Sequence, residues 1–209
     1  MITNLTKQDL IDFEEDIANT FNQGKIRAPI HLDVGNEDDL LEVFEEIQPE
    51  DWVFCTWRSH IKCLLKGVPP DVVKAEILDG KSIGLCFPSH HVYSSAIVAG
   101  AIPIALGAAF DLKRKGDPGK VWCFVGDMGA QHGAFHEALM YAENFDLPLH
   151  FVVEDNGKSV CTDTRESWGS SEHSITRSEA ISMMSDRVTY YKYDLGVPHA
   201  GTNAGRVQF

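Results

Sequence analysis

The chain of 209 residues is 44% hydrophobic, which is enough for one compact domain with a substantial core. Its formal net charge is −13 and it has no long run of Lys and Arg, which argues against a nucleic-acid partner. No apolar stretch is as long as a membrane span, the N-terminus lacks a signal-peptide pattern, and five cysteines without a CxxC pair indicate reduced thiols. We therefore expect a soluble cytoplasmic protein with no membrane or nucleic-acid partner.

Two helices are predicted near the N-terminus. Residues 6–23 carry an apolar stripe at helical spacing with acidic residues opposite, and Gly24 follows as a stop. A loop then leads through His31 to a second helix that begins near Glu37, where an acidic first turn suits the positive end of the helix. A single histidine in a loop is more often structural than catalytic, so the residues alone leave both interpretations of His31 open.

A short apolar strand is predicted within residues 51–60, and it runs into Trp57, Arg58, Ser59 and His60. The guanidinium of Arg58 has the planar fork that binds phosphate oxygens in pairs, although a surface salt bridge is the ordinary alternative. His60 fits either a place beside a substrate or a hydrogen-bonded place in a loop. This segment is therefore a candidate for phosphate binding.

The middle of the chain is less specific. His90 and His91 are adjacent, but neighbouring side chains rarely point together, so the pair is poor evidence for a metal site. Residues 94–110 have mostly small side chains and predict a helix that is packed closely on both sides, as at a contact with a sheet or a subunit. Residues 113–120 predict a surface turn.

A strand–helix–strand pattern is the clearest feature of the chain. Residues 121–125 are apolar and uncharged, residues 133–144 have helical spacing, and residues 149–153 form a second apolar run. This order predicts a right-handed βαβ unit. Polar clusters follow the two strands at Asp127 and Asn156, and the carboxyl ends of parallel strands are where open α/β sheets bind ligands.

The atoms at these two turns suit a hard cation. Asp127 offers a carboxylate, Asn156 an amide oxygen and the next turn free carbonyls, whereas neither turn has the Cys and His cluster that zinc favours. Mg²⁺ accepts one or two such ligands and completes its shell with water and phosphate oxygens. Gly129 and the start of the helix present N–H groups to the phosphates themselves. The residues predict a clamp for magnesium and diphosphate; the alternative is an ordinary Rossmann-like unit with a chance Asp and Asn.

The same residues resemble a known signature. Gly126-Asp127-Met128 is followed by 27 residues (129 to 155) and then Asn156. This resembles the thiamine diphosphate signature, in which Gly-Asp-Gly precedes an Asn at that distance. Residues 133–157 are similar to the alpha subunit of the thiamine diphosphate-dependent 2-oxoacid dehydrogenases of the pyruvate, branched-chain and acetoin types. Met128 stands where the family has Gly; because only its backbone N–H is needed, we expect binding to survive with less room beside the phosphate.

The resemblance implies roles for individual residues. Mg²⁺ would be coordinated by Asp127, Asn156 and the carbonyl of Lys158. His31, in a Pro-x-His-Leu context like that of the family, would lie near the reactive thiazolium ring, and His60 is the second catalytic candidate. The other implied contacts with thiamine diphosphate are Arg58 and Gly126, Met128 and Gly129 at the diphosphate, Trp57 in place of a Tyr, and Val98 where the V-shaped cofactor would lean.

The resemblance covers about residues 15–165 and fails after Thr164, whereas the alpha subunits of the family continue with further strands and loops. We therefore expect a chain that is truncated at its C-terminus. It would form one thiamine diphosphate-binding domain, residues 1–209, with residues 165–209 as a divergent C-terminal arm. The alternating residues at 188–193 suit a final strand or an arm.

Several residues near the predicted site have no clear motif. Asn36 stands where the family has Gln ahead of an acidic residue. In the tail, His199, Gly201 and Gly205 could serve binding, but no motif requires it. These positions are left without an assigned role.

The expected fold is α/β, a parallel sheet flanked by helices of the thiamine diphosphate-binding type. The expected protein is the alpha-type subunit of a two-chain enzyme that decarboxylates a 2-oxoacid and passes on the acyl group. A beta-type subunit would complete the active site in a two-plus-two assembly, with a lipoyl acyltransferase as a further candidate partner. Residues 155–159 resemble transketolase more closely, so the N-terminal half of a split transketolase-like carboligase is one alternative. A catalytically silent scaffold subunit is the other.

Overall fold

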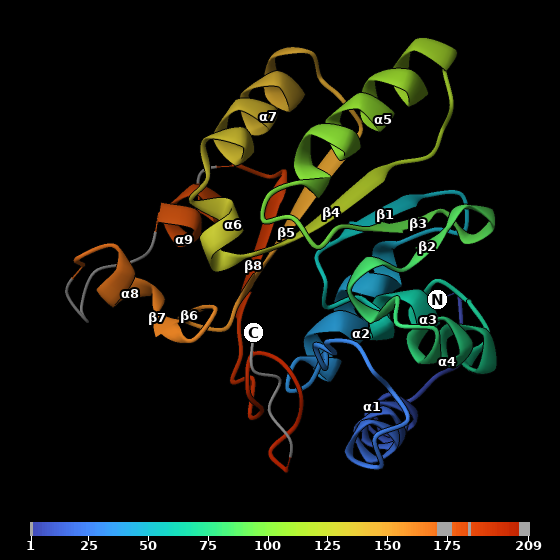
Figure 1. Cartoon of the computed structure of the whole chain (residues 1–209). Helices are drawn as coiled ribbons and strands as arrows, with labels where there is room; N and C mark the ends of the chain where they lie inside the picture. Colours follow the sequence, from blue (N-terminus) through green and yellow to red (C-terminus); the bar gives the residue numbers. More distant parts are fainter. Residues whose placement is uncertain (1, 171–176, 184, 205–209) are drawn as a thin grey trace.

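The centre of the molecule is a mostly parallel sheet (Figure 1). A computed structural model describes residues 2–170, 177–183 and 185–204, and within them six strands pair in the order β2-β3-β1-β4-β5-β8. All neighbours are parallel except β2 and β3. The strands are β1 (Trp52–Cys55), β2 (Cys86–Phe87), β3 (Val92–Ser94), β4 (Val121–Gly126), β5 (Leu149–Asp155) and β8 (Val188–Lys192). The α/β class predicted from the sequence is confirmed.

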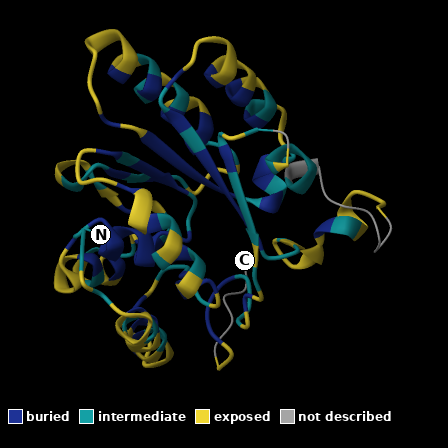
Figure 2. Ribbon diagram, turned by 180° about the vertical axis from the view of Figure 1, so that it is seen from behind, coloured by how far each residue is buried: buried dark blue, intermediate teal, exposed yellow. Residues whose placement is uncertain are grey.

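The central strands are apolar because helices cover both faces of the sheet, and Figure 2 shows them as the most buried part of the molecule. Alternate residues of β4 enter two different hydrophobic clusters. Phe124 packs with helices of the N-terminal half, whereas Cys123 and Val125 pack with the helices on the opposite face. Both faces of β4 are therefore buried, so residues 121–125 must be apolar and uncharged on either face of the sheet, as the sequence predicted.

One face is covered by the N-terminal helices α1 to α4 and the other by α5 and α7 (Figure 1). Helix α1 begins with a capping box, in which the Thr6 hydroxyl accepts from the Asp9 N–H at 3.3 Å and the Asp9 carboxylate accepts from the Thr6 N–H at 2.8 Å. The predicted first helix is confirmed. The N-terminal helices are α1 (Lys7–Asn22), α2 (Glu37–Glu46), α3 (His60–Leu65) and α4 (Pro70–Leu78), followed by short 3-10 helices at Ser82–Gly84 and Pro88–His90.

The helix predicted at residues 94–110 starts later than expected. Ser94 ends strand β3, a loop follows in which Ala99 has a positive φ of 59°, and helix α5 runs over Ala101–Lys115. The prediction was wrong because small residues support a strand end, a loop and a helix equally well. The buried face of α5 rests on the sheet, as one of the two predicted contacts, while Ile104 on the other side is 44% exposed.

The predicted βαβ unit is confirmed. After β4, the four-residue helix α6 (Asp127–Ala130) leads into α7 (Gly133–Asn144), whose bounds are those predicted, and β5 then pairs with β4 in parallel. His132 caps the N-terminus of α7, because its Nδ1 accepts a hydrogen bond from the N–H of Ala134 at 3.1 Å. The register places Gly126 opposite Glu154, so the two polar turns lie next to each other at one edge.

The chain beyond β5 returns to the sheet. A hairpin of β6 (Lys158–Ser159) and β7 (Thr162–Asp163) is followed by α8 (Thr164–Ser167), α9 (Arg177–Ser182) and β8, which pairs in parallel with β5. The tail then comes back to the N-terminal half, where the Gly201 N–H donates to the carbonyl of Ile30 at 2.9 Å. Among the described residues, no helix combines the length and the apolar character that a membrane crossing requires.

Candidate functional site

A cavity of about 420 Å³ lies at the carboxyl ends of β1, β4 and β5. This is the edge at which parallel α/β sheets bind ligands. Every residue predicted from the sequence to hold the cofactor or the metal lines it, whereas His31 and His60 do not. The predicted residues on its wall are Trp57, Arg58, Val98, Gly126, Asp127, Met128, Gly129, Asn156 and Lys158.

The carboxylate of Asp127 is buried, with only 2% of the residue exposed. Burial raises its pKa to about 7; the hydrogen bond from the Thr164 hydroxyl to Oδ2 opposes the rise, and the nearby charge of Asp155 adds to it. The charged form of Asp127 therefore lacks a compensating positive charge in this environment. A divalent cation would supply one.

The turn after β5 presents oxygen atoms to the same cavity. Asp155 accepts a hydrogen bond from the Gly157 N–H at 2.8 Å and another from the Tyr190 hydroxyl. Gly157 has a φ of 67°, which glycine adopts without a steric penalty, and Asn156 Oδ1 accepts from the Lys158 N–H at 3.0 Å. The turn thus holds the Asn156 amide oxygen and the carbonyls of the following residues near the end of the strand.

The donor set at these two turns fits Mg²⁺. Nowhere in the described ranges do three or more His, Cys, Asp or Glu side chains gather in a group able to hold a metal ion. Binding here would depend on one carboxylate, one amide oxygen and a backbone carbonyl, with water and phosphate oxygens completing the shell. Mg²⁺ is the common ion that accepts this combination, whereas zinc requires more nitrogen or sulfur ligands.

Arg58 lies in the wall of the cavity and is only 6% exposed. Its Nη1 donates to the carbonyl of Leu32, and its Nη2 donates to the carbonyl of His199 at 3.0 Å. These carbonyls fix the guanidinium, which has five N–H donors in all. A surface salt bridge, the alternative weighed from the sequence, does not describe a buried Arg58 held by backbone oxygens.

His31 lies behind the cavity and pairs with a second histidine from the tail. The Nε2 atoms of His31 and His199 are 3.2 Å apart, and the rings meet edge to face with centroids 4.7 Å apart. Burial, with Arg58 and His199 nearby, lowers the pKa of His31 to about 3, so this ring is neutral near pH 7. His199 itself lines the cavity. The sequence offered His199 only as a candidate without a motif.

His60 has a different environment from the one its catalytic prediction requires. It is fully buried at the start of α3, its Nδ1 lies 3.1 Å from the Glu14 carboxylate, and its Nε2 lies 2.8 Å from the Ser82 hydroxyl. Both ring nitrogens are therefore engaged away from the cavity. This geometry corresponds to the structural interpretation of His60. His90 and His91 do not line the cavity either.

A buried ion cluster supports the floor of the cavity and was not visible in the sequence. Lys62 is fully buried, and its Nζ lies 2.8 Å from Asp33 Oδ2 and 2.7 Å from Glu154 Oε1. Although burial acts to lower the pKa of Lys62, these two carboxylates raise it above its ordinary value. Glu154 lines the cavity and also accepts hydrogen bonds from Tyr191 at 2.7 Å and Asn36 at 3.1 Å.

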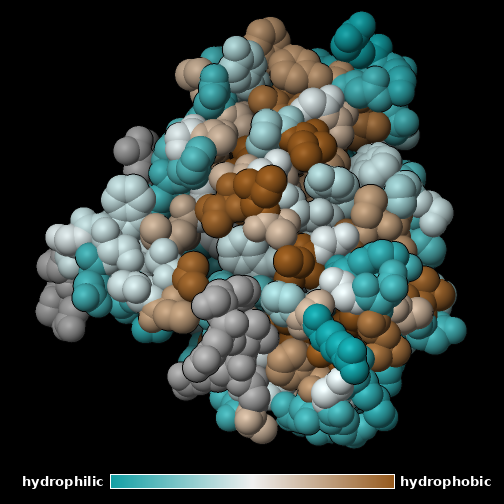
Figure 3. All heavy atoms as spheres, in the orientation of Figure 1, coloured by the Kyte–Doolittle hydropathy of each residue, from teal (hydrophilic) through white to brown (hydrophobic). Residues whose placement is uncertain are grey.

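The predicted residue Val98 lies at the mouth of the cavity. It is 51% exposed in the loop before α5, and Ile97 beside it is 73% exposed. Figure 3 shows hydrophobic side chains on this face of the molecule. Gly201, proposed from the sequence as a binding residue, instead bonds to the N-terminal half, and Gly205 lies outside the described residues.

These features define a mostly parallel α/β domain with a cavity at the edge where its polar turns meet. Residues 6–188 match the protein family described as "Dehydrogenase E1 component", and the chain belongs to that family. The match begins earlier and ends later than the span of about residues 15–165 recognised from motifs.

Comparison with individual proteins supports the resemblance to alpha subunits. The chain is 34% identical over 181 residues to the alpha subunit of the pyruvate dehydrogenase E1 component of Porphyra purpurea. The aligned region covers 73% of this chain and 52% of that protein. It is 34% identical over 161 residues to the alpha subunit of acetoin:2,6-dichlorophenolindophenol oxidoreductase of Bacillus subtilis, and the aligned region covers 72% of this chain and 48% of that protein. The pyruvate dehydrogenase E1 alpha subunit of Zymomonas mobilis is 30% identical over 187 residues, and the aligned region covers 84% of this chain and 49% of that protein. The chain spans about half the length of these relatives.

Proposed function

We propose that this chain is the alpha-type subunit of a two-chain, thiamine diphosphate-dependent enzyme that decarboxylates a 2-oxoacid and passes on the acyl group. The observation that carries the proposal is the convergence of Asp127, Asn156 and Arg58 on one cavity. The names of the relatives, a pyruvate dehydrogenase component and an acetoin oxidoreductase, support a substrate of this class.

Two sets of residues would bind the diphosphate, one through Mg²⁺ and the other directly. Asp127, Asn156 and the carbonyl of Lys158 would hold Mg²⁺, which links the protein to a diphosphate. Arg58 would donate to the diphosphate oxygens with N–H groups that do not serve Leu32 or His199. Thiamine diphosphate, when bound, supplies the carbon nucleophile and the electron sink for decarboxylation. The protein contributes position, charge and exclusion of water.

The histidine pair would handle protons at the reacting end. His199 lines the cavity, and its Nε2 shares one proton with the Nε2 of His31 behind it. Burial lowers the pKa of both rings, that of His31 to about 3, so the pair is neutral near pH 7 and His199 can donate or accept a proton as the reaction proceeds. In this proposal His31 acts through His199, while His60, held by Glu14 and Ser82, has no direct part.

The proposal includes a beta-type partner at the mouth of the cavity. Ile97, Val98 and Val160 line the cavity and are 73%, 51% and 54% exposed, which is a large apolar exposure for one rim. Of the carboxylates on the cavity wall, Asp127 belongs to the metal turn and Glu154 is paired with Lys62. A partner chain would cover the apolar rim and supply the carboxylate that activates the cofactor. A two-plus-two assembly and a lipoyl acyltransferase as acceptor belong to the same proposal.

A split transketolase-like carboligase is the second candidate, because residues 155–159 resemble that class. Its sugar phosphates would need cations near the mouth. On the described part of the cavity wall, the Lys and Arg side chains are Arg58, which is buried, and Lys158, which lies 3.9 Å from Asp163. This supply of positive charge favours a 2-oxoacid over a sugar phosphate.

Calorimetric titration of thiamine diphosphate into the chain purified together with a beta-type partner, with and without Mg²⁺, tests the binding part of the proposal. We expect binding that requires Mg²⁺; a chain that binds no cofactor under either condition would instead be a scaffold subunit. Decarboxylation of 2-oxoacids is then assayed with the chain alone and with a beta-type chain. Robust turnover by this chain alone would contradict the two-chain proposal.

A further inference from the structure

One short segment is tied to both turns of the proposed metal site. Residues 162–168 comprise β7, which is the second strand of the hairpin β6–β7, α8 and the residue that follows it. The Asp163 side chain accepts hydrogen bonds from the backbone N–H groups two and three residues further on, at 2.9 and 3.4 Å, which caps the start of α8. The Thr164 N–H donates to the carbonyl of Gly157 at 3.0 Å. This bond joins the segment to the turn that carries Asn156.

The side chain of Thr164 makes a second connection, to the other turn. Thr164 is 4% exposed, and its hydroxyl donates to Oδ2 of Asp127. A carboxylate oxygen accepts at more than one position, so this bond orients Asp127 without consuming its capacity to bind a cation. One threonine therefore contacts the end of β4 through its side chain and the turn after β5 through its backbone.

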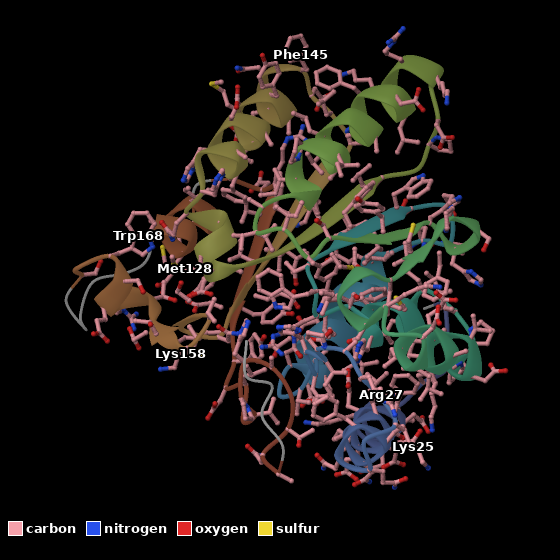
Figure 4. All side chains as sticks on the ribbon, viewed as in Figure 1. Lys25, Arg27, Met128, Phe145, Lys158 and Trp168 are labelled. Carbon is pink, nitrogen blue, oxygen red and sulfur yellow. The ribbon has the colours of Figure 1, made fainter. Side chains whose placement is uncertain are left out.

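Trp168 makes the third connection. Its indole Nε1–H donates to the sulfur of Met128 at 3.0 Å, and Figure 4 shows the two side chains next to each other. Met128 occupies the position where the family signature has Gly, and its side chain is held against the rim of the cavity by this contact. A thioether sulfur is a weak hydrogen-bond acceptor, so the contact directs Met128 more than it stabilises the fold.

We propose that residues 162–168 act as a clip that holds the two turns at the separation required by Mg²⁺ and a diphosphate. Thr164 is the positioning residue for Asp127, and Trp168 is the positioning residue for Met128. The inference rests on the proposed function, because it concerns the geometry of the same metal site.

The expected loss of metal affinity follows from comparable sites, in which one residue positions a metal ligand without touching the metal. Removing such a partner weakens metal binding by about ten- to a hundredfold. Thr164→Val keeps the shape of the side chain but removes the hydroxyl, so the affinity for Mg²⁺ with thiamine diphosphate should fall within this range. Thr164→Ser keeps the hydroxyl and should stay close to the wild type. Trp168→Ala should weaken binding by about two- to tenfold, since only a weak hydrogen bond to the Met128 sulfur is lost.

Two measurements on the full chain test the clip. Calorimetry with Mg²⁺ and thiamine diphosphate gives the affinities, and hydrogen exchange on the metal-free protein reports whether residues 127–130 and 156–160 open more often in Thr164→Val. Ser167→Ala is the matched control, because the exposed Ser167 hydroxyl bonds only to the carbonyl of Asp163 among the described residues. We expect faster exchange and weaker binding in Thr164→Val, and neither change in Thr164→Ser or Ser167→Ala.

The possible failures are distinguishable. If the wild type binds Mg²⁺ and thiamine diphosphate but Thr164→Val binds them equally well, the clip is overturned and the proposed function stands. The clip is also overturned if Thr164→Ser loses as much affinity as Thr164→Val, because the hydroxyl is then not what matters. If the wild type shows no Mg²⁺-dependent binding, the proposed function and the clip fail together.

Discussion

Replacing Lys62 by Met tests whether the buried ion cluster supports the floor of the cavity. Lys62 is fully buried, and its Nζ lies within 2.8 Å of carboxylates from Asp33 and Glu154, which are themselves 0% and 5% exposed. Methionine fills a similar volume but leaves both carboxylates without a cation. Removing one partner of a buried ion pair costs about 3 to 5 kcal/mol of folding stability. This is a large fraction of the roughly 5 to 15 kcal/mol that stabilises a domain of ordinary size.

Urea unfolding followed by circular dichroism measures the loss of folding stability in Lys62→Met. The matched control is Lys74→Met, which removes a lysine from an exposed pair with Asp16, where the side chains are 33% and 52% exposed. Such a pair contributes about 0 to 1 kcal/mol, so the two variants should differ severalfold in their effect. The double variant Lys62→Met with Glu154→Gln removes one of the stranded charges and should recover a substantial part of the loss.

The double variant also keeps the test informative if Lys62→Met alone does not fold. A loss below about 1 kcal/mol in Lys62→Met, similar to that of Lys74→Met, would refute the reasoning, because a surface-like value means that the cluster is solvated. The reasoning also fails if Glu154→Gln adds to the loss instead of reducing it. In either case Glu154 would not be held on the cavity floor by a buried cation.

The remaining predictions concern the site itself. Asp127→Ala should abolish Mg²⁺-dependent binding of thiamine diphosphate while leaving the fold intact, and wild-type affinity by calorimetry would rule out Asp127 as a ligand. Arg58→Ala should raise the cofactor concentration needed for half-maximal activity, whereas His31→Ala should lower turnover at saturating cofactor by about a hundredfold; full turnover in His31→Ala would leave that histidine a structural role. Because the pKa of His31 is lowered from its ordinary 6.5 to about 3, the unfolded chain binds a proton that the folded chain does not, so stability should fall as the pH decreases from about 6.5 toward 3. His31→Gln should show a shallower fall in the urea midpoint over this range, and an unchanged slope would contradict the assignment.

The sequence predicted the part of the site that depends on regular structure. Once residues 121–125 and 149–153 are parallel strands joined by one helix, Asp127 and Asn156 must emerge at the same edge. Arg58 follows a strand of the same sheet, so it reaches the same cavity. The placement of Asp127 and Asn156 required only hydrophobic periodicity and the direction of the chain, and the pairing of β4 with β5 confirms the basis for it. Arg58 was assigned to the same site by the resemblance to the family.

The parts that could not be predicted depend on contacts between distant segments. His60 lies only two residues after Arg58, but the turn into α3 directs it to Glu14 instead of the cavity. The partners of Lys62 lie 29 and 92 positions away (62 − 33 and 154 − 62), and no local pattern records such a cluster. The late start of α5 has a different cause, since Ala and Gly carry too little side chain to distinguish a strand, a loop and a helix.

The positions at which this chain departs from the family signature have partners in its C-terminal part. Met128, which replaces a Gly, contacts Trp168, and Asn36, which replaces a Gln, donates to Glu154 and to the hydroxyl of Tyr191 in β8, each at 3.1 Å. Both partners come after Thr164, where the motifs recognised in the sequence end. Met128 and Glu154 both line the cavity, and Tyr191 also donates to Glu154. Substitutions of Trp168 and Tyr191 should therefore affect cofactor binding and not stability alone.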